Sequence, residues 1–151
     1  MIRIISVGKL KEDYLKEAVL EYQKRLSKYH KVEIIEVEDS KVDDKNIALN
    51  EEKERVLKNI LPKAYIITLE INGKELTSEE LANLIDKTFI TNSDIVFIIG
   101  GSYGINQDII DIANYHLSFS KLTFPHQLFR VLLLEQLFRS FKILNNEKYH
   151  K

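Results

Sequence analysis

Residues 95–104 read IVFIIGGSYG, an unbroken run of five apolar side chains that ends in a glycine-rich loop. A run without polar alternation is typical of a parallel strand that is covered on both faces. Glycine has no Cβ atom, so the loop lets its backbone approach a ligand closely. Open α/β sheets bind ligands at the carboxyl ends of their strands, where this loop lies. The stretch therefore predicts the centre of an α/β fold, with a loop that is either a ligand-binding loop or a plain tight turn.

Segments with strand and helix patterns alternate on both sides of this stretch. Four further segments are rich in isoleucine, valine or leucine and are typical of strands: residues 1–7, 32–37, 64–71 and a short segment around Leu117. Five segments favour helices, most of them through apolar residues spaced three and four apart: residues 10–29, 50–59, 77–89, 107–114 and 125–145. Strands that alternate with helices predict a single α/β domain over residues 1–151, with a mostly parallel sheet flanked by helices.

The connections between these segments carry signals of their own. Residues 39–50 are polar and acidic, so we expect a mobile loop that leads into a helix starting near Asn50. Asn72-Gly73 has the chemistry of a turn, which places the end of the third strand just before it. Thr77, with Glu80 three residues later, forms a capping box that predicts the start of the next helix.

The last predicted helix is apolar around most of its circumference. Its apolar residues do not form one stripe: they are Leu128, Phe129, Val131, Leu132, Leu133, Leu134, Leu137, Phe138 and Phe141. A helix of this kind must be covered on most sides. A domain of this size has room to cover one side, so a partner subunit is the simplest cover for the other, and a twofold homodimer is the default. The alternative is a helix that lies wholly inside one chain.

The composition excludes several classes of protein. The chain has no cysteine, which excludes disulfides, thiolate zinc sites and cysteine nucleophiles. No apolar run approaches the length of a membrane span, and the N-terminal apolar run is too short for a signal peptide. We therefore expect a protein of the reducing cytoplasm that does not bind membranes.

The net charge of −1 does not indicate nucleic-acid binding, but the charges are unevenly distributed. Residues 1–31 hold eight Lys or Arg against four Asp or Glu, and residues 121–151 hold six against two. Residues 33–54 hold three against nine. Nucleic-acid binding depends on the basic face that meets phosphate, so the two basic ends are interpreted either as a nucleic-acid surface or as solvated faces.

Besides the glycine loop, two segments carry groups suited to chemistry. Residues 117–124 read LSFSKLTF and supply three hydroxyls just before a proline-started helix, which suits either a polar ligand or a helix cap with its loop. Arg130 lies in an apolar segment and needs a partner such as phosphate, whereas Glu135 and Arg139 are spaced to pair on the helix surface. The glycine loop matches neither a phosphate-binding loop nor a dinucleotide fingerprint. The four histidines show no metal-ligand spacing, so we expect no metal site.

Taken in order along the chain, these and other short motifs resemble one known family. The matching motifs are Val7-Gly8-Lys9-Leu10, Glu21-Tyr22-x-x-Arg25-Leu26, Thr68-Leu69-Glu70, Ile98-Ile99-Gly100-Gly101-x-x-Gly104, Leu117-Ser118-Phe119-Ser120-Lys121-Leu122-Thr123-Phe124-Pro125-His126-Gln127-x-x-Arg130-Val131, Glu135-Gln136-x-x-Arg139 and Tyr149-His150-Lys151. They resemble the ribosomal large subunit methyltransferase H family of the SPOUT superfamily over essentially the whole chain. Each motif is weak alone, but together they are highly specific. Tyr103 lies where the glycine loop varies in the family, so it receives no role.

The resemblance implies a SPOUT fold, in which the C-terminal chain threads a loop to form a trefoil knot, and an obligate homodimer. It also implies that S-adenosyl-L-methionine is used to methylate N3 of pseudouridine 1915, in helix 69 of 23S rRNA, on the assembled 70S ribosome. The cofactor contacts that it implies fall largely on the two loops described above: Leu69, Gly100, Phe119, Ser120, Lys121, Leu122, Thr123 and Phe124.

Given this cofactor, the chemistry sets the remaining requirements. The sulfonium makes the methyl group a good electrophile, so the protein must mainly position donor and acceptor in line. N3 carries a proton at neutral pH, so a general base or a polarising cation should help to remove it. Our hypothesis assigns four residues beside the cofactor loop and the dimer seam to target positioning or proton handling: Arg130, His126, Tyr149 and His150. Two rival functions are a SPOUT enzyme that methylates tRNA and a ribosome-binding protein without catalysis.

Overall fold

The computed structural model describes residues 1–151 and contains one five-stranded sheet, in which every strand pair is parallel. The strands are β1 (Ile2–Val7), β2 (Val32–Val37), β3 (Tyr65–Glu75), β4 (Ile95–Ile99) and β5 (Tyr115–Ser118). The helices are α1 (Asp13–Leu26), α2 (Lys45–Leu57), α3 (Ser78–Thr91), α4 (Gln107–Ile112) and α5 (His126–Leu144). The strand order is β2-β1-β4-β3-β5, so the predicted α/β class with a mostly parallel sheet is confirmed.

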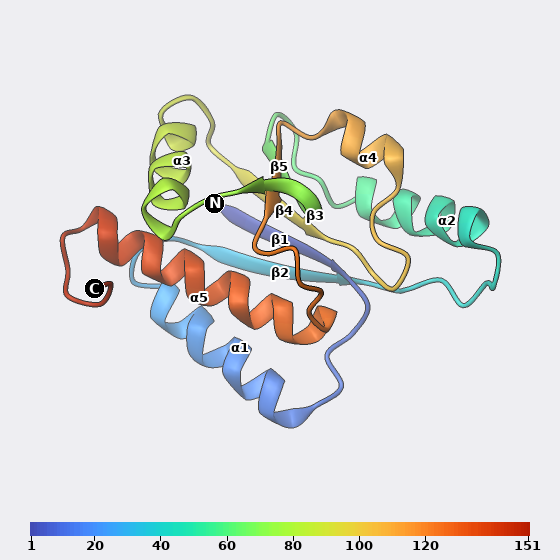
Figure 1. The fold of residues 1–151 in the computed structure, drawn as a ribbon, viewed down its shortest axis with the longest axis horizontal. Helices are drawn as coiled ribbons and strands as arrows, with labels where there is room; N and C mark the ends of the chain where they lie inside the picture. Colours follow the sequence, from blue (N-terminus) through green and yellow to red (C-terminus); the bar gives the residue numbers. More distant parts are fainter.

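The helices cover the sheet in two layers, with α1 lying alongside α5 and α2 beside α4 (Figure 1). Helices α1, α3 and α5 pack on one face, where the core combines Phe97 of β4 with Leu133 of α5. Helices α2 and α4 cover the other face, where Ile98 of β4 packs with Val56 of α2. All five residues of β4 are buried, which is why its sequence shows no polar alternation.

Helix α5 is covered more fully by its own chain than its sequence alone suggested. It lies between α1 and α3 and packs against both. Its buried residues include Leu134, Leu137 and Phe141, which point into the larger core. An apolar strip on α5 is only partly covered: Leu128 is 39% exposed, Leu132 is half-buried, and Val131, also half-buried, packs against the edge of the core. None of the helices, α5 included, is both long and apolar enough to cross a membrane.

Helix α2 begins five residues earlier than predicted, at Lys45 instead of Asn50. The side chain of Asp44 accepts a hydrogen bond from the backbone N–H of Ile47 at 3.0 Å, and so caps the helix. The prediction of a loop over residues 39–50 was therefore wrong for its second half. The acidic composition concealed a capping residue, because an aspartate suits a loop and a helix start equally well.

The turn predicted at Asn72-Gly73 is also wrong, because β3 continues through it to Glu75. The pairing of β3 with β5 shifts register between Leu69 and Lys74, so the extra residues form an irregularity inside the strand. A Cβ atom on Gly73 would lie 2.8 Å from the carbonyl oxygen of His116 on β5. The glycine is needed for this close approach of two strands and not for a chain reversal.

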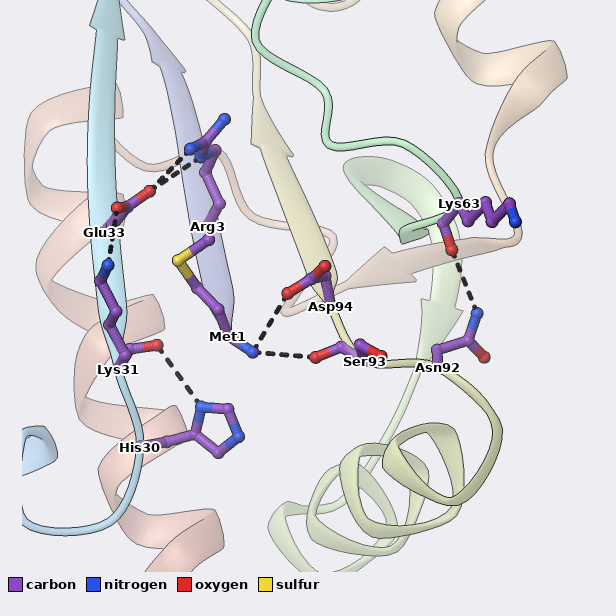
Figure 2. A network of polar contacts seen from close by, with 9 residues as sticks. All are labelled: Met1, Arg3, His30, Lys31, Glu33, Lys63, Asn92, Ser93 and Asp94. Carbon is purple, nitrogen blue, oxygen red and sulfur yellow. Dashed lines mark hydrogen bonds and ion pairs between the residues drawn. The ribbon is translucent and has the colours of Figure 1, made fainter.

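Polar contacts tie the strands together at their amino ends (Figure 2). The amino group of Met1 donates a hydrogen bond to the carbonyl oxygen of Ser93 at 2.8 Å and pairs with Asp94 at 3.2 Å. Arg3 of β1 pairs with Glu33 of β2 at 2.8 Å. These contacts hold together the amino ends of β1, β2 and β4.

Candidate functional site

A cavity of about 350 Å³ opens at the carboxyl ends of β3, β4 and β5. Its volume lies within the range of small-molecule sites. Three chain segments form most of its wall. Residues 69–72 lie within β3, directly after its pairing with β4 ends at Thr68, whereas residues 99–105 and 117–124 end and follow β4 and β5. His126 and Phe129 at the start of α5 complete it. The two loops that the sequence singled out therefore lie together around one hollow.

The glycine loop is a tight turn and also a wall of this cavity. The N–H of Gly104 donates a hydrogen bond to the carbonyl oxygen of Gly101 at 3.0 Å, which closes the turn. Gly104 has a φ of +82°, a conformation that favours glycine. A Cβ atom on Gly100 would lie 2.5 Å from the carbonyl oxygen of Gly104. The tight turn is confirmed, and it brings bare backbone to the cavity, so the ligand-binding interpretation stays a prediction.

The segment after β5 supplies aromatic rings and hydroxyl groups to the same cavity. Phe119 packs against Phe129 of α5, with ring centroids 4.8 Å apart. The hydroxyl of Ser120 accepts a hydrogen bond from the backbone N–H of Leu122 at 3.0 Å, which holds the loop in a compact turn. Of the residues that the family resemblance implies for the cofactor, all but Lys121 line the cavity: Leu69, Gly100, Phe119, Ser120, Leu122, Thr123 and Phe124. The side chain of Lys121 is exposed.

Glu70 also lines the cavity, and the sequence analysis gave it no role. Its Oε2 atom accepts a hydrogen bond from the hydroxyl of Thr68 at 2.6 Å. The same oxygen lies 2.5 Å from Nδ1 of His116 on β5. The available signal was an acidic residue at the carboxyl end of a strand next to the glycine-loop strand. His116 carried no signal, because its proximity to Glu70 depends on the pairing of β3 with β5.

Arg130 lies outside the cavity wall and is only 2% exposed. Its guanidinium pairs with the carboxylate of Glu36 at 2.5 Å and donates a hydrogen bond to the carbonyl oxygen of Gly8 at 3.2 Å. Burial acts to raise the pKa of Glu36, but the hydrogen bonds from Arg130 and from the backbone of Leu10 outweigh it, and the pKa lies below its usual value. Arg130 therefore joins α5 to the carboxyl ends of β1 and β2.

Tyr149 and His150 lie far from the cavity of their own chain. The cavity is at the start of α5, whereas the C-terminus lies beyond the other end of this helix (Figure 1). The hydroxyl of Tyr149 donates to Glu135 at 3.1 Å; partial burial, and then this hydrogen bond, raises its pKa above the usual value. His150 bridges Arg139 at 3.1 Å and Glu79 of α3 at 2.6 Å.

The nature of the His150 contacts determines its protonation. Arg139 can only donate a hydrogen bond, so Nδ1 of His150 must accept it and carries no proton. Nε2 then bears the proton that is donated to Glu79. The side chain of His150 is thus held between Arg139 and Glu79. Of the four residues in the catalytic hypothesis, the fold brings only His126 to the cavity.

No three His, Asp or Glu side chains gather closely enough to hold a metal ion. The arrangement instead offers a largely apolar hollow with bare backbone, hydroxyl groups and a single carboxylate. No lysine or arginine lines it. Such a site suits an organic ligand with an aromatic part and few or no negative charges, and it does not suit a phosphate group.

Comparison with known proteins gives one consistent result. The profile of a family described as "Predicted SPOUT methyltransferase" matches residues 1–150. The chain is 54% identical over 157 residues to ribosomal RNA large subunit methyltransferase H of Clostridium botulinum (strain Hall), with 99% of each protein covered. Its structure is similar to that of a probable methylase family protein from Haemophilus influenzae Rd KW20, with a TM-score of 0.59 and 17% identity over 99% of this chain and 70% of that one. A second similar structure is TrmJ from Z. mobilis ZM4, with a TM-score of 0.52 and 14% identity over 93% of this chain and 70% of that one.

Proposed function

The chain belongs to the SPOUT methyltransferase family, and from this premise we propose that it transfers a methyl group from S-adenosyl-L-methionine to 23S rRNA. The observation that carries the proposal is the full-length identity of 54% to a protein named as a large-subunit rRNA methyltransferase. The cavity at the carboxyl ends of three parallel strands is the physical counterpart, because this is where open α/β sheets bind ligands.

The residues of the cavity fit this cofactor. Phe119 and Leu69 offer apolar surface for an adenine ring, and Gly100 leaves backbone that no Cβ atom covers. The hydroxyls of Ser120 and Thr123 are suited to polar groups. We propose that Leu69, Gly100 and the run Phe119–Phe124 hold the cofactor, with Lys121 taking part through its backbone. When bound, S-adenosylmethionine supplies a methyl group that is already activated by its sulfonium.

We propose N3 of pseudouridine 1915, in helix 69 of the assembled 70S ribosome, as the methyl acceptor. The protein's tasks are then to hold the base in line and to accept or stabilise the N3 proton. His126 is the histidine at the cavity wall, and its side chain is exposed to an incoming base. We propose that Arg130 acts indirectly: its contacts with Glu36 and Gly8 fix the start of α5, and thereby the position of His126.

A role for Tyr149 and His150 requires a second chain. Their own cavity lies at the opposite end of α5, so they reach a bound base only from a partner subunit. The apolar strip of Leu128, Val131 and Leu132 on α5 supports the homodimer that this requires. The trefoil knot stays a prediction.

Methyl-labelled S-adenosylmethionine tests the reaction directly. The purified protein is incubated with 70S ribosomes, free 23S rRNA or tRNA, and the labelled nucleoside is identified by mass spectrometry. We expect one methyl group on a pseudouridine of ribosomal 23S rRNA and no label on tRNA. Label on tRNA alone would assign the chain to the rival tRNA enzymes. Ribosome binding without any heat of cofactor binding would assign it to the non-catalytic class.

Mixed dimers test the contribution of the tail across subunits. His126→Ala and His150→Ala each remove one proposed contribution, so we expect each homodimer to be nearly inactive. Co-refolded mixtures contain heterodimers in which one of the two sites has both histidines, so activity returns to roughly a quarter of the wild type. An inactive mixture of folded dimers would show that both histidines act on the cavity of their own chain, and active homodimers would show that neither histidine is needed.

A further inference from the structure

Glu70 is the only carboxylate among the residues that line the cavity, and no lysine or arginine lines it. Its side chain is 19% exposed, so solvent screens it only in part. Its Oε2 atom has two partners, whereas Oε1 accepts no hydrogen bond within the chain. A carboxylate with a free oxygen in a largely apolar hollow attracts a positive charge or a hydrogen-bond donor.

Two neighbouring side chains, Thr68 and His116, hold this carboxylate in place. Thr68 is fully buried on β3, and its hydroxyl proton is donated to Oε2 of Glu70. Nδ1 of His116 reaches the same oxygen from β5, and an ionised carboxylate can only accept, so Nδ1 carries a proton. Both contacts end on Oε2, which restrains the carboxyl group and leaves Oε1 without a partner in the chain. Residues of the chain itself supply both contacts, and such restraint lowers the cost of ordering a side chain when a ligand binds.

We infer that Glu70 is a specificity residue that recognises the positive charge of the methyl donor, with Thr68 and His116 as positioning residues. The inference rests on the proposed function, since S-adenosylmethionine carries a sulfonium and an ammonium. Loss of the methyl group turns the sulfonium into a neutral thioether, so the attraction of Glu70 is weaker for the product than for the donor. The residue thereby favours exchange of spent cofactor for fresh donor.

Three ligands of decreasing positive charge test the inference by calorimetric titration. S-adenosylmethionine carries a sulfonium and an ammonium, S-adenosylhomocysteine carries only the ammonium, and methylthioadenosine carries neither. For Glu70→Gln, which keeps the shape and removes the charge, we expect about tenfold weaker binding of S-adenosylmethionine. We expect a smaller loss of affinity for S-adenosylhomocysteine and no loss for methylthioadenosine. Glu75→Gln is the matched control, because Glu75 is exposed on the same strand and does not line the cavity.

Each other outcome overturns the inference in a defined way. An equal loss for all three ligands would show that Glu70 contacts the ribose hydroxyls instead of a charge. Unchanged binding of S-adenosylmethionine, with Glu70→Gln as heat-stable as the wild type, would show that Glu70 has no part in recognition. Failure of the wild type to bind S-adenosylmethionine would refute the proposed function itself, so the two failures are distinct.

The positioning role of His116 is tested with two substitutions. His116→Ala removes the Nδ1 donor, whereas His116→Asn keeps an N–H donor near the same place. We expect His116→Ala to weaken binding of S-adenosylmethionine severalfold but not that of methylthioadenosine, and His116→Asn to restore it. In the Glu70→Gln background, His116→Ala should have no further effect. An equal loss in both backgrounds would show that His116 acts independently of Glu70.

Discussion

Glu36 lies near the end of β2 and Glu70 lies within β3, and their surroundings prepare them for different tasks. Glu36 accepts hydrogen bonds from the buried guanidinium of Arg130 and from the backbone of Leu10. Both hydrogen bonds end on its Oε2 atom, and because the guanidinium of Arg130 is buried, the pair contributes to stability. Glu70 has partners on one oxygen only, which leaves the other for a ligand. Glu70 lines the cavity and Glu36 does not, so position at the cavity separates the candidate recognition residue from the structural acid.

The pairing of Glu36 with Arg130 predicts an acid-sensitive contribution to stability. The pKa of Glu36 is lowered in the folded chain, so the folded state binds its proton less readily than the unfolded state. The contribution is complete above the usual value of about 4.5 and is lost as the pH falls through the folded-state pKa. For Glu36→Gln we expect a loss of about 1 kcal/mol at pH 7, a value that allows for solvent screening.

Urea unfolding of the wild type and of Glu36→Gln from pH 7 to pH 3 measures this contribution. The difference between their free energies of unfolding should be constant down to about pH 4.5 and then shrink. A difference that grows as the pH falls would contradict the account of the pair.

Gly100 is the glycine at which an added Cβ atom would have the least room. A Cβ atom there would lie 2.5 Å from the backbone oxygen of Gly104, a contact that no side-chain movement relieves. We expect Gly100→Ala to lower the free energy of unfolding by about 2 kcal/mol and to weaken binding of S-adenosylmethionine. Ser102→Ala, an exposed change in the same loop, is the control and should leave both quantities unaltered. Wild-type binding by a folded Gly100→Ala protein would remove this loop from the proposed site.

Among the helices and strands, the features predicted correctly are those that depend on residues close together in the sequence. The apolar run of β4 and the capping box of Thr77 and Glu80 are both found as expected. The start of α2 was missed because Asp44 has the same local signature in a loop and at a helix start. The continuation of β3 through Gly73 was missed because its cause is β5, a strand more than 40 residues away in the chain.

The close approach of β3 and β5 at Gly73 yields a prediction for these two elements. An added Cβ atom would lie 2.8 Å from the backbone of His116, so Gly73→Ala must push β5 away. We expect a loss of about 1–3 kcal/mol in stability and weaker cofactor binding, because residues 117–124 line the cavity. Lys74→Ala, at the next and exposed position, is the control. Equal stability and affinity of the two variants would show that the strand irregularity does not set the cavity wall.

At the scale of the whole molecule, the sequence predicted the class of the fold and most of the cavity wall. The family resemblance placed the cofactor contacts on loops that the structure brings together, with Lys121 as the exception. Neither pattern nor resemblance indicated the contacts of Arg130 with Glu36 or of His116 with Glu70, because they join residues distant in sequence. Such contacts follow from strand order, which periodicity does not reveal.

The proposed dimer is also a property of the whole molecule. Leu128 is exposed on the strip of α5 that its own chain leaves uncovered, so Leu128→Glu should cost little in one chain but place two charges at a twofold seam. We expect it to shift the protein from dimer to monomer in light scattering. Ile90→Glu on α3, where the native side chain is 78% exposed, should remain a dimer. A monomeric wild type, or a dimer unaffected by Leu128→Glu, would contradict this seam.

The most direct test of the account is a crystal structure of the chain grown with S-adenosylhomocysteine. The account predicts that the nucleoside lies in the cavity at the carboxyl ends of β3, β4 and β5, in contact with Leu69, Gly100 and residues 119–124. Density for the ligand at any other place, with this cavity empty, would contradict it.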